Sequence, residues 1–166
     1  GKIDDIAIVK SGNIKPENLA EGIKEIGKLE NAGVNLDEGI MVQLRNHGTD
    51  PGHWAEIKIA SNRLEDMDVL TLDKKFGNYE YDIFSKFKGT NKGLVEEVKN
   101  GKNFDEKGFG DAINRLNYAK GKTIDEVEIV DTRLTVSKEY FENMPEWAKA
   151  AAVENKISII TFEGVR

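Results

Sequence analysis

Residues 78–102 contain two strand-like segments on either side of a short turn. The first segment, NYEYDIFSKFK, carries Asp82. The turn GTNKG is rich in glycine and asparagine, and residues 93–99 form the second segment, GLVEEVK. Such turn residues between two strand-like segments are typical of a β-hairpin. The sequence therefore predicts two neighbouring strands, with Asp82 on one and Glu97-Val98-Lys99 at the end of the other.

These residue types favour metal-dependent phosphodiester chemistry. Two carboxylates hold a hard divalent cation through oxygen, and the cation activates water and neutralises phosphate charge. A lysine beside them can hold the nucleophile or a phosphoryl oxygen as a point charge. Residues two apart on a strand share a face, so Glu97 and Lys99 should point the same way and Glu96 the opposite way. The alternative is an exposed hairpin with alternating charges, since a second acid-x-lysine triplet occurs at Glu56-Ile57-Lys58.

Composition limits the kind of metal site and ligand. The chain has no cysteine and two histidines, so a metal should be bound mainly by oxygen, which favours Mg²⁺ or Mn²⁺. The net charge of −6 counts against extensive non-specific binding of nucleic acid, yet lysines gather in the middle of the chain. Lys102, Lys86 and Lys88 are therefore candidate substrate contacts. No apolar run approaches the roughly 18–20 residues of a membrane span.

The rest of the chain predicts an α/β fold with a mixed central sheet flanked by helices. A turn-rich segment at residues 46–52 divides it into an N-terminal subregion of unknown role, residues 1–50, and a core, residues 51–166. Helices are expected at residues 16–31, 52–66 and 104–120, and from 137 to about 155 with a break at Pro145. Strands are expected at residues 3–9, 39–44, 67–72 before a turn at 73–77, 127–136, and 157–162 inside the sheet. Trp54 and Trp147 are expected in the core.

Helical periodicity argues against Glu56-Ile57-Lys58 as a strand site. On a helix at residues 52–66, Glu56 and Lys58 lie on different faces, so this triplet is not a strand site. Glu56 alone remains of interest.

In this order, these residues resemble the PD-(D/E)xK nuclease superfamily, with its restriction-endonuclease-like core, over roughly residues 52–162. That core has a helix, a three-stranded meander, a helix and a further strand. Its first helix often carries a glutamate, its second strand an aspartate and its third strand Glu-x-Lys. The resemblance implies that Glu56, Asp82 and Glu97 bind Mg²⁺ or Mn²⁺ and that Lys99 completes the catalytic set.

The chain also departs from the family pattern. Tyr81 stands where the proline that names the motif would precede Asp82. Many members carry a glutamine on the helix after the lysine, and here Asn114 or Asn117 would have to serve.

The resemblance further implies an endonuclease that hydrolyses phosphodiester bonds of DNA or RNA, tRNA included, and leaves 5′-phosphate and 3′-hydroxyl ends. The chain also resembles C-terminal toxin domains of bacterial polymorphic or contact-dependent growth inhibition systems. Such a domain is delivered as part of a secreted protein, acts in the cytoplasm of a target cell and has a cognate immunity protein. A phage or repair nuclease is a competing interpretation. A second class of function is a non-catalytic acidic binding module of the immunity or adaptor type.

Overall fold

The computed structural model describes residues 14–36 and 51–166. Its helices are α2 (Pro16–Asn31), α4 (Pro51–Arg63), α5 (Glu106–Ala119), α6 (Lys138–Glu142) and α7 (Glu146–Glu154). Its strands are β1 (Met67–Phe76), β2 (Tyr79–Phe87), β3 (Lys92–Lys99), β4 (Thr123–Ile124), β5 (Val127–Ser137) and β6 (Ser158–Phe162). The expected strands at residues 3–9 and 39–44 lie outside the described residues.

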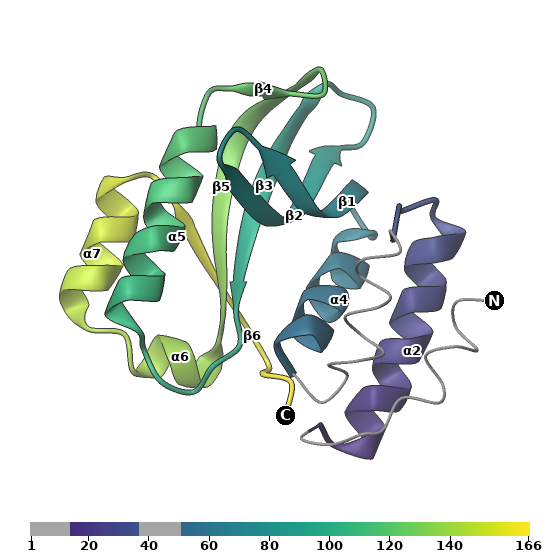
Figure 1. Cartoon of the computed structure of the whole chain (residues 1–166), viewed down its shortest axis with the longest axis horizontal. Coiled ribbons are helices and arrows are strands. Elements are labelled where there is room, and N and C mark those ends of the chain that lie inside the picture. The colour runs from purple at the N-terminus through teal and green to yellow at the C-terminus, as the bar shows by residue number, and fades with distance from the viewer. Residues whose placement is uncertain (1–13, 37–50) are drawn as a thin grey trace.

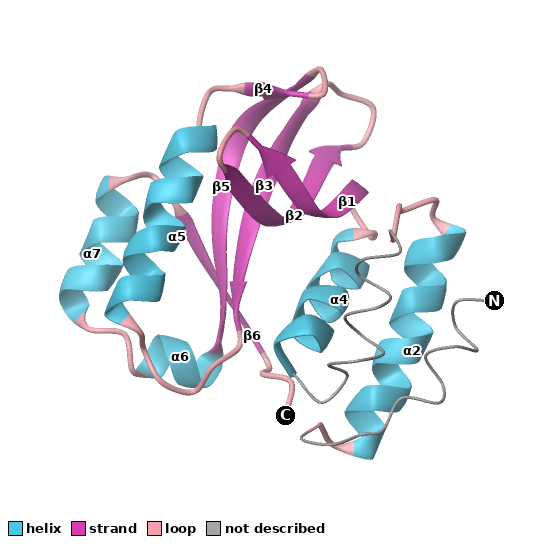
Figure 2. Ribbon diagram, viewed as in Figure 1, coloured by secondary structure: helices cyan, strands magenta, loops and turns pink. Residues whose placement is uncertain are grey.

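One mixed sheet forms the centre of the molecule (Figure 1). β1, β2 and β3 are an antiparallel meander, β3 is parallel to β5, and β5 also pairs with β4 and β6. Figure 2 shows α5 and α7 on one side of the sheet and α4 and α2 on the other. The predicted α/β fold with a flanked mixed sheet is therefore confirmed, in the order expected of a restriction-endonuclease-like core: α4, the meander, α5, then β5.

β3 lies between two apolar cores and directs alternate side chains to each. Val95 packs in the core that contains the buried face of α5. The alternation continues through the two acids, because Glu96 meets Arg63 of α4 and Glu97 meets Arg115 of α5. The prediction that Glu96 and Glu97 point to opposite faces is confirmed.

The described part of the N-terminal subregion packs against α4. Trp54 of α4 is 1% exposed and shares an apolar core with Ile26 of α2. Asn35 forms an isolated parallel bridge with Thr71 of β1. The division of the chain near residue 50 stays a prediction, but α2 and α4 contribute to one core.

β1 is longer than the sequence suggested. The expected turn at residues 73–77 is wrong, since β1 continues to Phe76, which pairs with Tyr79 across a turn at Gly77-Asn78. Gly77 has a φ of 62°, which glycine adopts without a Cβ penalty. The polar run DKK looked like a turn, but it lies on the edge strand of the sheet, where charged residues are tolerated. Asp73 consequently belongs to a strand.

Two expectations about burial are also corrected. Among the described strands β6 pairs with β5 alone, so it is an edge strand; its apolar residues reflect its packing against α6 and α7. Trp147 is 51% exposed, because its ring packs edge-on against Phe104 and Phe109 and leaves the remainder to solvent. The two-residue strand β4 had no sequence signal. None of the described helices is long and apolar enough to cross a membrane.

The contact between α2 and α4 can be tested at a glycine. A Cβ at Gly22 would lie 2.8 Å from Cζ3 of Trp54 and nearer still to Cε3. We expect Gly22→Ala to lower the free energy of unfolding by about 1–3 kcal/mol through overpacking. Gly110→Ala is the matched control, since a Cβ at Gly110 would meet nothing within 4 Å. The control should gain about 0.5–1 kcal/mol from helix propensity. Denaturant unfolding measures both, and an equal gain in the two variants would contradict the packing of α2 on Trp54.

Candidate metal centre

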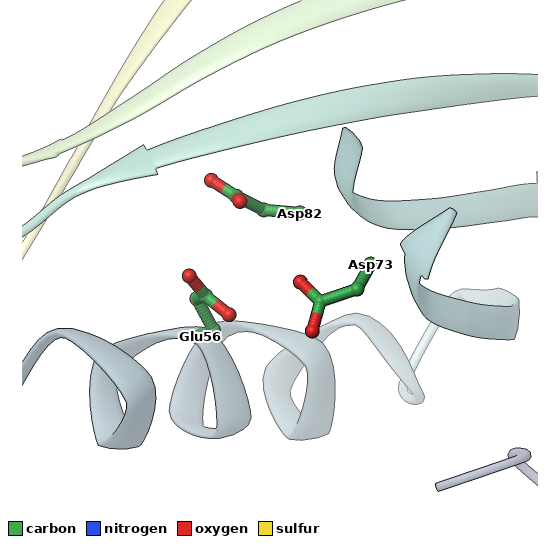
Figure 3. A group of neighbouring side chains, drawn as sticks. All are labelled: Glu56, Asp73 and Asp82. Carbon is green, nitrogen blue, oxygen red and sulfur yellow. The ribbon is translucent and has the colours of Figure 1, made fainter. Parts of the chain in front are cut away.

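Three carboxylates from three elements meet beside the sheet. Glu56 comes from α4, Asp73 from β1 and Asp82 from β2, and each side chain points toward the other two (Figure 3). One oxygen from each lies within 4.8 Å of the others, and all three residues are half-buried. Oxygens bound to a common cation at about 2.0–2.6 Å are separated by no more than about 5 Å. The spacing therefore suits one divalent cation without rearrangement of the backbone.

The turn at Gly77-Asn78 explains why Asp73 reaches Asp82. Leu72 pairs with Ile83 and Lys74 with Tyr81, so Asp73 lies opposite Asp82 across the hairpin. Asp73 has a φ of 51°, in the left-handed region that aspartate enters more readily than most residues. This local turn of the backbone sets the direction of the carboxylate. Sequence reasoning missed Asp73 because it ended β1 too early; the Gly77-Asn78 pair, centred between the two aspartates, was the available signal.

Glu97 lies next to Asp82 where β2 and β3 separate. The regular pairing of these strands ends at Ile83 and Glu96. Beyond that point the backbone amides of Asp82 and Val98 donate to side-chain carboxylates and not to backbone carbonyls of the neighbouring strand. The Asp82 amide donates to Oε2 of Glu97 at 3.3 Å, and the Val98 amide donates to Oδ2 of Asp82 at 2.8 Å. The two acids are thus held together by the backbone groups that the separating strands leave unpaired.

Burial and the neighbouring charge of Glu97 both raise the pKa of Asp82. Desolvation raises the pKa of Asp82 well above its ordinary value, and the neighbouring charge of Glu97 raises it further. The hydrogen bond from the Val98 amide opposes the shift. A divalent cation beside Asp82 would oppose these effects and favour its ionised form.

Arg115 of α5 is the counter-charge on the other side of Glu97. Its Nε donates to Oε1 of Glu97, whose side chain is 3% exposed. The sequence had suggested Asn114 or Asn117 for the polar residue on this helix. Asn114 is exposed, and Asn117 donates to Oδ1 of Asn155 at 2.8 Å, so neither is the partner of Glu97. Arg115 carried no distinctive signal beyond its place beside the buried stripe of α5.

Glu96 is fully occupied on the opposite face. Arg63 donates to it through Nε at 3.1 Å and through Nη2 at 2.5 Å, and the Thr135 hydroxyl donates to Oε2. The residue is 0% exposed. These contacts leave Glu97, not Glu96, as the β3 acid next to Asp82.

The predicted lysines are placed unequally. Lys99 lies on the Glu97 face of β3, and its Nζ is 3.6 Å from the position that a Cβ of Gly108 would occupy at the start of α5. Lys102 is exposed on the loop that follows β3.

The other two predicted substrate contacts lie at the far end of the hairpin. Lys86 contacts Asp68 at 3.8 Å and donates to the Thr90 carbonyl, and Lys88 donates to the Leu64 carbonyl at 3.2 Å. A strand advances about 3.3 Å per residue, so the Cα atoms of Lys86 and Lys88 lie about 13–20 Å from that of Asp82 along the strand direction. The structure does not bring Lys86 and Lys88 together with the acidic group.

Lys58 is separated from Glu56 as expected. Its Nζ donates to the Glu163 carbonyl at 2.9 Å, whereas Glu56 joins the carboxylates. The triplet on α4 therefore contributes one residue to the site.

The raised pKa of Asp82 predicts a pH-dependent cost of folding without metal. Below the unfolded-state pKa of about 3.9, Asp82 is protonated in both the folded and the unfolded protein. Above that pH Asp82 ionises first in the unfolded protein, so the free energy of unfolding falls until the pH passes the folded-state pKa. Asp82→Asn has no ionisable group at this position and should not lose stability in this way. In EDTA its stability advantage over wild type should grow from acidic to neutral pH by about 1.4 kcal/mol per unit of raised pKa. Thermal melts check this, and Mg²⁺ should raise the Tm of wild type more than that of the variant. An advantage independent of pH would mean that Asp82 is ionised in the metal-free protein.

The chain was also compared with known proteins. No protein-family model and no curated protein matches it. Two solved structures are similar in fold: SfsA from Pyrococcus furiosus in complex with Ca²⁺, and EndoMS in complex with double-stranded DNA. For SfsA the TM-score is 0.41 at 11% identity, over 65% of this chain and 52% of that one. For EndoMS it is 0.44 at 13% identity, over 68% and 46%. The chain spans about half the length of each of these proteins.

Proposed function

We propose that this chain is a metal-dependent nuclease that hydrolyses phosphodiester bonds of DNA or RNA. One observation carries the proposal. Glu56, Asp73 and Asp82 converge on one point, with Glu97 bonded to the Asp82 amide beside it. Lys99 follows Glu97 on the same face of β3. Carboxylates grouped for a cation, next to a lysine, are the elements that phosphodiester hydrolysis requires.

The donor set fits a hard cation. All the candidate ligands are carboxylate oxygens, which suit Mg²⁺, Mn²⁺ or Ca²⁺ better than softer metals. Glu56, Asp73 and Asp82 would hold the cation, and Glu97 would join them through the oxygen that faces Asp82. A bound divalent cation supplies positive charge that neutralises a phosphate and activates water. We propose Mg²⁺, with Mn²⁺ as the substitute.

The chain's own residues would orient the substrate around that point. Lys99 is half-buried and makes no hydrogen bond or ion pair with the residues that the structure describes, so its ammonium is available for a phosphoryl oxygen or an attacking water. The Val98 amide fixes Asp82, and Arg115 fixes Glu97. These contacts hold the carboxylates in place before substrate arrives, and preorganised charge is usually the largest contribution to catalysis.

The placement of Glu56, Asp82, Glu97 and Lys99 supports membership of the PD-(D/E)xK superfamily as part of this proposal. We further propose an endonuclease of the toxin type, delivered within a secreted protein, active in the cytoplasm of a target cell and neutralised by an immunity protein. The support for this part is the resemblance in sequence.

The direct test is an assay of purified protein on plasmid DNA, total RNA and tRNA, with Mg²⁺, Mn²⁺ or EDTA. We expect cleavage of at least one substrate in Mg²⁺ or Mn²⁺ and none in EDTA. The preferred substrate identifies the class of nucleic acid. Metal-independent cleavage would reject the proposed chemistry, and no cleavage of any substrate would favour the acidic binding module.

Lys99→Ala should abolish most of the activity while the fold persists. An electrostatic contact to the reacting phosphate is worth about 3–4 kcal/mol, so the rate should fall about 10²–10³-fold. Lys92→Ala is the matched control, because Lys92 is an exposed lysine at the opposite end of the same strand. Single-turnover rates measure the effect, and thermal melts verify folding. Cleavage by Lys99→Ala at the rate of the Lys92 variant would make Lys99 an ordinary surface lysine.

A further inference from the structure

Arg115 uses only part of its guanidinium group within the protein. Its Nε donates to Glu97, whereas Nη1 and Nη2 make no hydrogen bond to any residue that the structure describes. Neither nitrogen is buried without a hydrogen-bond partner, and the Arg115 side chain is 26% exposed. The outer edge of the group is therefore open to solvent beside Glu97.

Arg63 shows the other way in which this fold uses an arginine. It donates to Glu96 through both Nε and Nη2, and its side chain is 15% exposed against 0% for Glu96. This pair occupies the Nε–Nη2 edge of Arg63. Arg115 donates through Nε alone, so its Nη1–Nη2 edge is left for another ligand.

The backbone holds Arg115 in position. The Tyr81 hydroxyl donates to the Arg115 carbonyl at 2.6 Å, and Tyr81 is 0% exposed. Because Tyr81 directly precedes Asp82, the same strand that positions the aspartate also fixes this turn of α5. The guanidinium thus stays next to the carboxylates.

The face of α5 around Arg115 carries cations together with carboxylates. Lys107, Asp111 and Arg115 are four residues apart and share one side of the helix, and Lys107 pairs with Asp111 at 3.0 Å. Lys99 approaches the same face from β3, next to Gly108. The hydrogen bond from Lys107 lowers the pKa of Asp111, and the charges of Arg115 and Lys99 contribute. The cations Lys99, Lys107 and Arg115 and the carboxylates of Asp105 and Asp111 therefore lie on this side of the sheet.

We propose that Nη1 and Nη2 of Arg115 bind a backbone phosphate of the nucleic acid while Nε remains on Glu97. The inference rests on the proposed function and names a phosphate contact of the same site. A planar guanidinium fork matches two phosphate oxygens, which a lysine cannot do. The position also has an electrostatic reason: four nearby carboxylates repel a phosphate, and Arg115 offsets part of that charge at the edge where the strand enters.

The test separates binding from cleavage. A labelled DNA duplex and a labelled single-stranded RNA are titrated in EDTA with wild type, Arg115→Gln and Arg115→Lys, at a series of salt concentrations. Arg115→Gln should bind about 10- to 100-fold more weakly through loss of a charge-assisted contact. The slope of log K against log salt should fall by about 0.7–0.9, the contribution of one neutralised phosphate. Arg115→Lys should keep the slope, because the charge remains, and still bind more weakly than wild type.

Arg133→Gln is the matched control. Arg133 also pairs with an aspartate through Nε, at 2.8 Å, and its side chain is 19% exposed, but it lies on the Glu96 side of the sheet. This control should retain wild-type affinity and slope. Thermal melts identify folded variants, and Arg115→Lys keeps a cation beside Glu97 if the glutamine variant fails to fold.

The outcomes are distinguishable. A wild-type slope in Arg115→Gln, a wild-type affinity in Arg115→Lys, or no binding of either probe by wild type would overturn the phosphate contact. Binding by wild type without cleavage in Mg²⁺ or Mn²⁺ would overturn the proposed nuclease, and the salt slopes would still decide the role of Arg115.

Discussion

The structure depends on how β3 accommodates two consecutive buried glutamates. Glu96 and Glu97 are 0% and 2% exposed, and strand alternation forces them to opposite faces. A buried carboxylate is tolerated only with a partner, and each flanking layer supplies an arginine: Arg63 from α4 and Arg115 from α5. Loss of either partner would leave an uncompensated charge, so both helices are fixed in position relative to β3. The central strand is thereby tied to both layers by charge as well as by apolar packing.

The two ion pairs differ in the number of hydrogen bonds that each glutamate accepts. Glu96 accepts from Arg63 twice and from Thr135, and it lies on the face opposite to Glu97 with 0% exposure. Glu97 accepts a single donor at each oxygen, one from Arg115 and one weakly from the Asp82 amide. The weak contact exists because β2 and β3 have separated there, and that separation also gives Asp82 room to meet Glu56 and Asp73. The functional asymmetry of the two glutamates thus follows from where a strand pairing ends.

The sequence predicted those parts of the site that local periodicity determines. A period of two put Glu97 and Lys99 on one face, and a helical period separated Glu56 from Lys58. Asp73 was missed because its place depends on the register of a hairpin, and a shift of the turn by a few residues moved it out of the strand. Arg115 was missed because helix-to-strand ion pairs depend on the rotation of α5, which Tyr81 fixes from a distant part of the chain. Lys86 and Lys88 were grouped with the site by charge alone, although strand length places them at the far end of the hairpin.

The charge balance of the site follows from these contacts. Glu56, Asp73 and Asp82 form one group with Glu97 beside it, and two cations, Arg115 and Lys99, lie on the α5 side. Arg63 of α4 pairs with Glu96 on the opposite face, whereas Arg115 places positive charge beside Glu97 on the α5 side. A small divalent cation is favoured where the acids converge, while a large anion is favoured only along α5. Under the proposed function, metal and phosphate would bind on different sides of one group of side chains.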